Sequence, residues 1–186
     1  MFLTDILRRE APLADAIAAP SLGLMPGALV ETETGWAPVE SLYPGQRLQV
    51  SGGGLRPLVA IWADAPASGT AIHVPGGVLD NCEDLMLGES QLVLLDTLGD
   101  PDVPDAMEVL VPAAALVGRR GITRRALPRP QPLLRLMFDE EEVFWAQSGV
   151  MLHGASVAHP ETALMSADFV QLSQPRSAAF LERRLA

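Results

Sequence analysis

Glycine and proline interrupt this chain so often that no long helix can run through its middle. The 186 residues include 16 Gly and 16 Pro but only 5% aromatic residues. Because proline lacks a backbone donor and glycine weakens regular elements, this punctuation favours short strands joined by turns. With 48% hydrophobic residues, the chain can form one domain with a sizeable core. A mainly β fold is expected, with strands at 28–32, 46–50, 55–62, 70–74, 91–95, 108–112, 133–138 and 143–147.

Two segments between these runs are expected to be turns or loops. Gly52-Gly53-Gly54 predicts a hairpin turn, where positive φ is needed, because no helix signal follows that would make it a phosphate-binding loop. Residues 96–106 are rich in Asp, Gly and Pro and are expected to form an exposed loop.

Both ends of the chain carry apolar residues at helical spacing. Residues 2–19 predict a helix that Pro12 divides and Pro20 ends, either packed on its own domain or docking a partner. After Gly154 two helical stretches are expected, separated by Pro175, with Arg183-Arg184 at a solvated helix end. The expected organisation is an N-terminal helical extension at 1–21, a β domain at 22–159 and a C-terminal helical tail at 160–186.

The net charge of −10 argues against nucleic acid as a partner, because phosphate binding needs clustered basic residues.

All 13 basic residues are Arg, a bias that GC-rich coding would explain. Five of them are candidates for docking an acidic protein partner. The alternative is a solvated loop neutralised by the acidic run 139–142. These five are Arg119, Arg120, Arg124, Arg125 and Arg129.

Cys82 is the single cysteine, which leaves no intramolecular disulfide and no cysteine-cluster metal site. Charged residues interrupt every apolar run near the N-terminus, so no secretory signal is expected there, and no apolar stretch approaches membrane-spanning length. A cytoplasmic protein without membrane insertion is the default expectation.

One block near the start resembles a known family. Residues 22–30 read LGLMPGALV, and residues 35–50 read GWAPVESLYPGQRLQV. This resembles the opening of a Hedgehog/intein (Hint) domain of the bacterial branch. Further matching pieces extend the resemblance to about residue 159; they are 55–62, 73–79, 83–87, 91–95, 108–113, 134–139, 142–143 and 152–154. The resemblance implies a pseudo-twofold disk of strands, and location outside the cell is an alternative because members of this branch are often attached to secreted or surface proteins.

The resemblance also implies a catalytic site whose residues are missing. Hint chemistry begins when a Cys, Ser or Thr attacks the carbonyl of the preceding residue, and Gly23 stands at that position. A His then protonates the scissile amide, and Gln91 stands where the family has it. Ser21 could substitute only from a displaced position. His73 fits a Thr-x-x-His spelling but lies on a different strand, and the only Asn, Asn81, lies mid-domain, which excludes self-excision.

Two further groups of residues are candidate sites. His153 and His159, with Glu161 and with Cys82 or Asp168, match no common zinc spacing, so neither a metal nor a cofactor is expected. Trp36, Trp62 and Trp145 would line a ligand pocket only if the fold gathered them, and dispersed tryptophans more often anchor cores or turns.

The sequence therefore predicts a mainly β, Hint-like disk of short strands with short helices at both termini. It predicts a catalytically inactive structural or protein-interaction module with an unidentified protein partner. The alternative is a self-cleaving Hint domain with a nonstandard nucleophile, which would be cut near residues 20–23.

Overall fold

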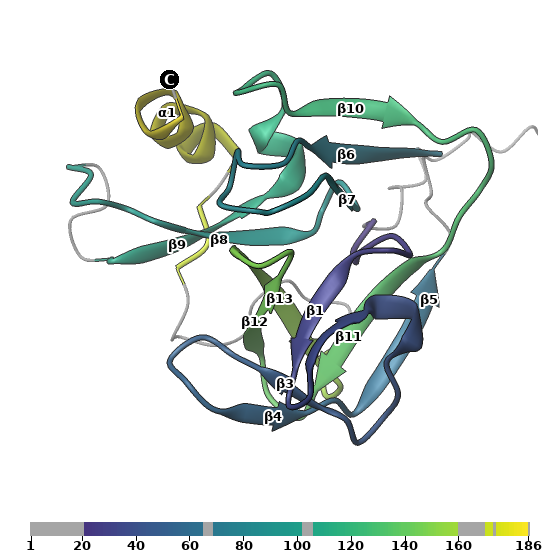
Figure 1. Ribbon diagram of the computed structural model, residues 1–186. Helices are drawn as coiled ribbons and strands as arrows, with labels where there is room; N and C mark the ends of the chain where they lie inside the picture. The colour runs from purple at the N-terminus through teal and green to yellow at the C-terminus, as the bar shows by residue number, and fades with distance from the viewer. Residues whose placement is uncertain (1–20, 65–68, 102–105, 160–169, 173, 186) are drawn as a thin grey trace, which may run out of the picture.

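The computed structural model describes residues 21–64, 69–101, 106–159, 170–172 and 174–185. They form thirteen strands, two short 3₁₀ turns and one α-helix (Figure 1). The first strands are β1 (Leu29–Thr32), β2 (Gly35–Pro38), β3 (Arg47–Gln49), β4 (Leu55–Pro57), β5 (Ala60–Asp64), β6 (Thr70–Val74) and β7 (Leu85–Leu87). The later ones are β8 (Leu92–Asp96), β9 (Glu108–Pro112), β10 (Thr123–Ala126), β11 (Leu133–Phe138), β12 (Glu142–Ala146) and β13 (Val150–Ser156). The 3₁₀ turns are η1 (Val39–Ser41) and η2 (Ala113–Leu116), and the helix is α1 (Gln174–Arg184).

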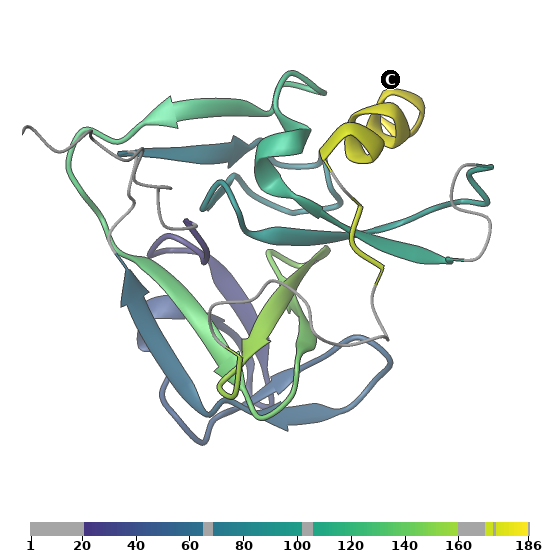
Figure 2. The same ribbon diagram turned by 180° about the vertical axis from the view of Figure 1, so that it is seen from behind.

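The strands form two sheets. Ten of them make one curled sheet with the central order β4-β3-β1-β12-β13-β11-β5, to which β2 adds through β1 and the β8–β9 hairpin through β13. A second sheet has the order β10-β6-β7, and its antiparallel strands β10 and β6 run side by side in Figure 1 and, from behind, in Figure 2. Leu24 joins the two sheets through bridges to Leu87 of β7 and Leu134 of β11. The segment that holds the predicted site therefore lies at the seam between the sheets.

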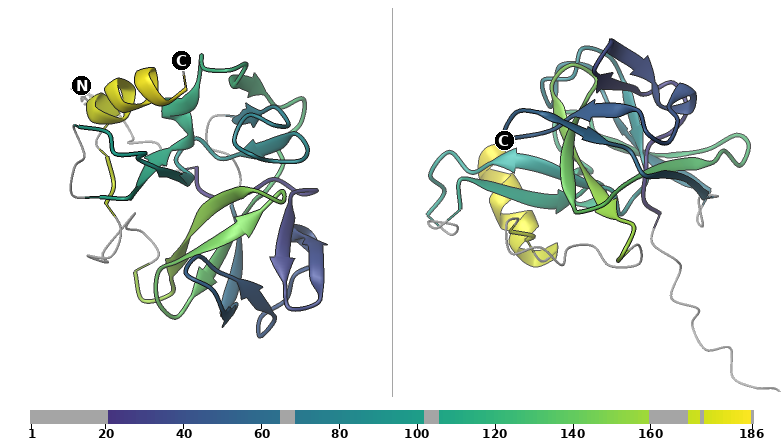
Figure 3. Two further views of the ribbon diagram at one scale, coloured as in Figure 1. Left: turned by 60° about the vertical axis from the view of Figure 1, so that its left-hand side comes forward. Right: turned by 90° about the horizontal axis from the view of Figure 1, so that it is seen from below.

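One apolar core spans both sheets and the helix. Phe138 and Phe144 pack inside it with ring centroids 6.1 Å apart. The helix α1 contributes Phe180 and Leu181, and Leu185, directly after the helix, is buried in the same cluster. Figure 3 shows α1 lying beside the β8–β9 hairpin. Because its apolar face is buried in the common core, α1 is part of the domain rather than a separate tail.

Most expected strands are present, with differences that follow from pairing. The mainly β fold is confirmed, and the turn at Gly52-Gly53-Gly54 has positive φ at all three residues. The expected strand 55–62 is two strands, because β4 pairs with β3 whereas β5 pairs with β11. The change of partner occurs at Leu58 and Val59, whose amides donate to Gln46 and Met137. The four strands that the pattern did not predict are β2, β7, β10 and β13.

The C-terminal predictions need correction. Strand β13 continues to Ser156, past the point at which helical spacing was expected to begin. Pro175 lies in the first turn of α1, where a proline is well tolerated. The end of α1 is not merely solvated, because Arg183 binds Asp100 with two contacts of 2.8 Å and Arg184 binds Asp96 at 2.9 Å. The same ion pair explains why Asp100 is buried inside the expected exposed loop 96–106.

Some predictions concern residues that the structure does not describe. The predicted helix at 2–19 and most of the stretch 160–173 lie outside the described residues. Among the residues that the structure does describe, no helix is both long enough and apolar enough to cross a membrane.

Candidate functional site

Gly23 lies in a segment held by backbone hydrogen bonds on both sides. Leu24 and Leu134 exchange two such bonds, with N···O distances of 3.0 and 2.7 Å. On the other side, the Gly88 amide donates to the Gly23 carbonyl at 2.9 Å and the Ser90 amide donates to the Ser21 carbonyl at 3.0 Å. The segment is thus fixed between β11 and the residues that lead into β8.

The backbone at Gly23 leaves no room for a side chain. Its φ of +113° lies in a region that residues other than glycine rarely adopt. A Cβ built on Gly23 would stand 2.7 Å from the Leu134 carbonyl oxygen and 2.8 Å from its carbon. Because the obstacle is backbone in a paired strand, rotation of a side chain cannot relieve it. The space that a nucleophilic side chain would need is filled by the Leu134 carbonyl.

Gln91 is buried directly against Gly23. Its Oε1 accepts a hydrogen bond from the Gly23 amide at 2.9 Å. Its Nε2 donates to the carbonyls of His153 at 2.8 Å and Leu92 at 3.0 Å. The two positions that the sequence assigned to one site are therefore in contact, although 68 residues separate them. An amide side chain has no proton to give or take near neutral pH, so this contact is a fixed hydrogen bond.

The profile of the Hint domain family matches residues 22–151, which is most of the chain and includes both Gly23 and Gln91. The chain belongs to the Hint domain family.

Three solved structures are similar to this Hint domain. The bacterial intein-like domain from Clostridium thermocellum has a TM-score of 0.48 at 11% identity, covering 72% of this chain and 100% of that one. A splice-inactive variant of the AceL NrdHF class 3 split intein has a TM-score of 0.49 at 13% identity, covering 73% and 99%. The MchDnaB-1 intein has a TM-score of 0.46 at 14% identity, covering 71% and 100%. A search of curated proteins returns no match.

The alternative nucleophile and base of this Hint domain have other structural roles. The Ser21 carbonyl is so close to Gly88 that a Cβ there would stand 2.1 Å from it, so Ser21 is fixed by its backbone. His73 is buried on β6, and its Nε2 lies 2.6 Å from Oδ2 of Asp84. This hydrogen bond, followed by one from the Gly76 amide, lowers the pKa of the Asp84 carboxyl. Asn81 is buried in the 75–83 loop, where its side chain binds three backbone groups.

The two other histidines do not form a described metal site. His153 is buried on β13 with Nε2 3.9 Å from Glu141 Oε1, and burial lowers the pKa of its imidazole while Glu141 opposes that shift. His159 lies in the turn after β13, and Cys82 is exposed. Glu161 and Asp168 lie outside the described residues. Within the described ranges, no three His, Cys, Asp or Glu side chains come together as metal ligands would.

The five candidate docking arginines do not act as one cluster. Arg119 donates to the carbonyls of Ala115 and Ala178 and so fastens η2 to α1. Arg124 forms a two-pronged contact with Glu89. The other three, Arg120, Arg125 and Arg129, are exposed.

Two residues of the acidic run contact parts of the fold outside this basic segment. Glu142 pairs with Arg56 at 2.9 Å, and Glu141 lies 3.9 Å from His153.

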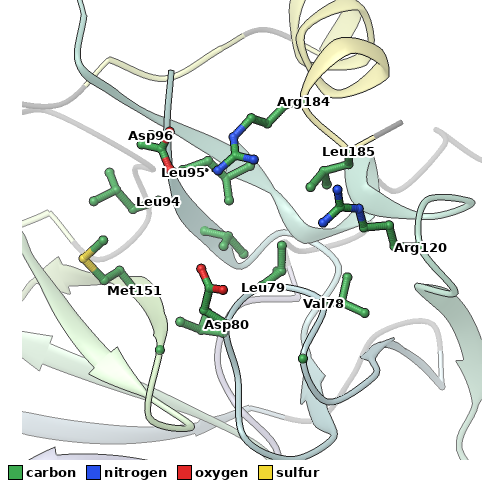
Figure 4. Close-up of a pocket in the computed structure, with 14 residues that line it drawn as sticks. Val78, Leu79, Asp80, Leu94, Leu95, Asp96, Arg120, Met151, Arg184 and Leu185 are labelled. Carbon is green, nitrogen blue, oxygen red and sulfur yellow. Dashed lines mark hydrogen bonds and ion pairs between the residues drawn. The ribbon is translucent and has the colours of Figure 1, made fainter. Parts of the chain in front are cut away.

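The tryptophans are not gathered around a described cavity. Trp36 and Trp62 are more than a third exposed, and Arg135 stacks over the Trp62 ring at 5.3 Å. A different pocket lies between the 77–80 loop, β8 and the end of α1 (Figure 4). Sequence reasoning missed this pocket and the role of the Leu134 carbonyl, because both depend on segments distant in the sequence.

Proposed function

We propose that this chain is a catalytically inactive Hint-domain protein that serves as a protein-interaction module. The observation that carries the first half is the environment of Gly23. A Hint reaction needs a side-chain nucleophile at this position, and the chain supplies none. The Leu134 carbonyl fills the space, and Gln91 holds the amide that a catalytic His would have to protonate.

The test of inactivity is the intact mass of the purified chain during incubation with a thiol and, separately, with hydroxylamine. A single unchanged mass is expected, because no acyl shift can form the ester or thioester that these nucleophiles cleave. A fragment ending at Pro20, Ser21 or Leu22 would instead support self-cleavage with a nonstandard nucleophile.

The edge of the smaller sheet supports the second half of the proposal. Strand β10 is paired only with β6 among the described residues, and all four of its residues are exposed. The Leu127 amide donates to Gly69 on the β6 side at 2.8 Å. Since alternate residues of an antiparallel pair face the partner strand, the backbone groups of Arg124 and Ala126 point away from β6. An edge of this kind can accept an added strand.

The charge around this edge favours an acidic extended segment as the occupant. Arg125 and Arg129 are exposed, and no ion pair involving either is found in the described part of the chain. A second copy of β10 would set arginines against arginines, which disfavours self-pairing. The partner expected here is therefore a protein with an acidic segment in an extended conformation.

This docking surface is tested with a short fluorescent peptide that alternates Glu and Val, using the same peptide with Lys in place of Glu as the control. Ala126→Pro removes an outward-pointing amide while leaving the inward β10–β6 bonds in place, so it should weaken binding of the acidic peptide. Arg125→Gln and Arg129→Gln should weaken it further and reduce its salt dependence. Equal binding by the wild-type chain and by Ala126→Pro would refute strand addition at β10.

A further inference from the structure

A pocket of about 190 Å³ lies where the C-terminal helix meets the sheets (Figure 4). Its walls come from the 77–80 loop, the end of β8, Arg120, the start of β13 and the end of α1. The buried apolar residues of the wall are Leu79, Val93, Leu94, Val150 and Leu185. The pocket therefore has an apolar floor beneath its charged side chains.

The walls are held in place from both sides. The ion pairs of Arg183 and Arg184 with Asp100 and Asp96 fasten the end of α1 over the pocket. On the opposite side, the Asp80 carbonyl packs so closely on Gly149 that a Cβ there would stand 2.0 Å from it. The α1 wall lies outside the stretch that matches the Hint family, which ends at residue 151. This pocket is thus built partly from residues beyond the family match.

Four charged side chains line the pocket. Arg184 and Asp96 pair with each other at 2.9 Å. Asp80 and Arg120 form no ion pair within the described ranges, although their charges are opposite and both line one cavity. Figure 4 shows Asp80 reaching into the pocket from the loop and Arg120 from another wall. Both have positive φ, 61° and 43°, a backbone state that is costly for residues other than glycine and clusters at functional sites.

We propose that this pocket binds a small zwitterion of the α-amino acid type with an apolar side chain. The ammonium group of the ligand pairs with Asp80, its carboxylate pairs with Arg120, and its side chain covers the apolar floor. A simple anion would meet the carboxylates of Asp80 and Asp96, and a simple cation would meet the two guanidinium groups. Because the four charges of the pocket balance, a ligand that carries both charges fits best.

The size of the pocket agrees with this class of ligand. A water molecule takes up about 30 Å³ in the liquid, so the volume corresponds to roughly six waters. That suits a single amino acid and is below the roughly 300 Å³ at which pockets for drug-sized ligands begin.

The test is calorimetric titration of the full chain with L-valine, L-leucine and L-methionine. N-acetyl-L-leucine, which lacks the cation, and L-leucine amide, which lacks the carboxylate, are the matched ligand controls. Asp80→Asn and Arg120→Asn remove one charge each and keep a residue that tolerates positive φ. Arg47→Gln removes an exposed arginine that lies outside both the pocket and the β10 edge, and it serves as the control variant.

We expect saturable binding of at least one amino acid in the millimolar range or tighter. Both blocked analogues should bind at least about tenfold more weakly than leucine, and both pocket variants should bind the amino acids at least about tenfold more weakly than the wild type. Arg47→Gln should bind like the wild type. The proposal is overturned if none of the three amino acids binds, if both analogues bind as well as leucine, or if both pocket variants keep full affinity. The Tm of each variant is measured as well. An unchanged Tm shows that the variant is folded, so that a loss of binding is due to the change in the pocket.

Discussion

Replacing Gly23 by cysteine should destabilise the fold rather than restore Hint chemistry. The φ of +113° costs about 1–3 kcal/mol for any residue with a Cβ. The Leu134 carbonyl must also move away from the new Cβ, which weakens the two backbone hydrogen bonds between Leu24 and Leu134. Each of these contributes about 1 kcal/mol. The expected loss is therefore about 3–5 kcal/mol, which lowers Tm by roughly 6–20 °C for a domain of this size.

Thermal and urea unfolding measure this loss, and two variants separate its causes. Gly23→Ala introduces the same Cβ without a thiol and should be destabilised as much as Gly23→Cys. Gly27→Ala carries only the conformational cost, because Gly27 has a φ of +94° but nothing within 4 Å of a built Cβ. The difference between Gly23→Ala and Gly27→Ala, about 2 kcal/mol, isolates the clash with Leu134.

Two results would refute this reasoning. If Gly23→Ala were no less stable than Gly27→Ala, the Leu134 carbonyl would not obstruct the position. If Gly23→Cys unfolded like the wild type and gained thiol-dependent cleavage, a single side chain would be all that separates this chain from an active Hint domain.

Three other perturbations follow from single contacts. Gln91→Met leaves the Gly23 amide and the His153 carbonyl without their buried partner, so urea unfolding should show a loss of about 2–5 kcal/mol; Gln91→Ala should cost no less. Burial lowers the pKa of the His153 imidazole, so the unfolded chain binds this proton at a higher pH than the folded chain does. The free energy of unfolding should therefore decline as the pH drops below about 6.5. The decline should be smaller in His153→Gln. Asp100→Ala removes the carboxylate that binds Arg183, so amide exchange in residues 176–185 should become faster, whereas unchanged exchange would mean that the core alone fixes α1.

The sequence predicted the parts of the fold that depend on local chemistry. Strands β6, β9 and β11 have the predicted bounds, because β-branched and apolar residues run between clear turn signals. Strand β10 was not predictable in this way, because its residues Thr-Arg-Arg-Ala are all exposed and only pairing with β6 makes them a strand. The break between β4 and β5 at Leu58 and Val59 could not be predicted either, because the pairing strand changes there while the composition does not.

The candidate site also has features that the sequence could predict and features that it could not. Family resemblance assigned Gly23 and Gln91 to one site, and the structure brings them into hydrogen-bond contact. No local pattern could reveal that the Leu134 carbonyl lies where a side chain would stand, because the approach depends on the pairing of Leu24 with β11. The arginine segment looked like one basic surface, but Arg119 and Arg124 bind within the fold. The unpredicted features arise from tertiary contacts that sequence spacing does not encode.

The most direct test of the central claim is a comparison of the wild-type chain with Ser21→Ala after long incubation in hydroxylamine at neutral pH, read by intact mass. The account predicts one unchanged full-length mass for each chain, since Gly23 offers no nucleophile and Ser21 is fixed by its backbone. A fragment that ends near Leu22 in the wild type and vanishes in Ser21→Ala would contradict it and identify Ser21 as the nucleophile of an active Hint domain.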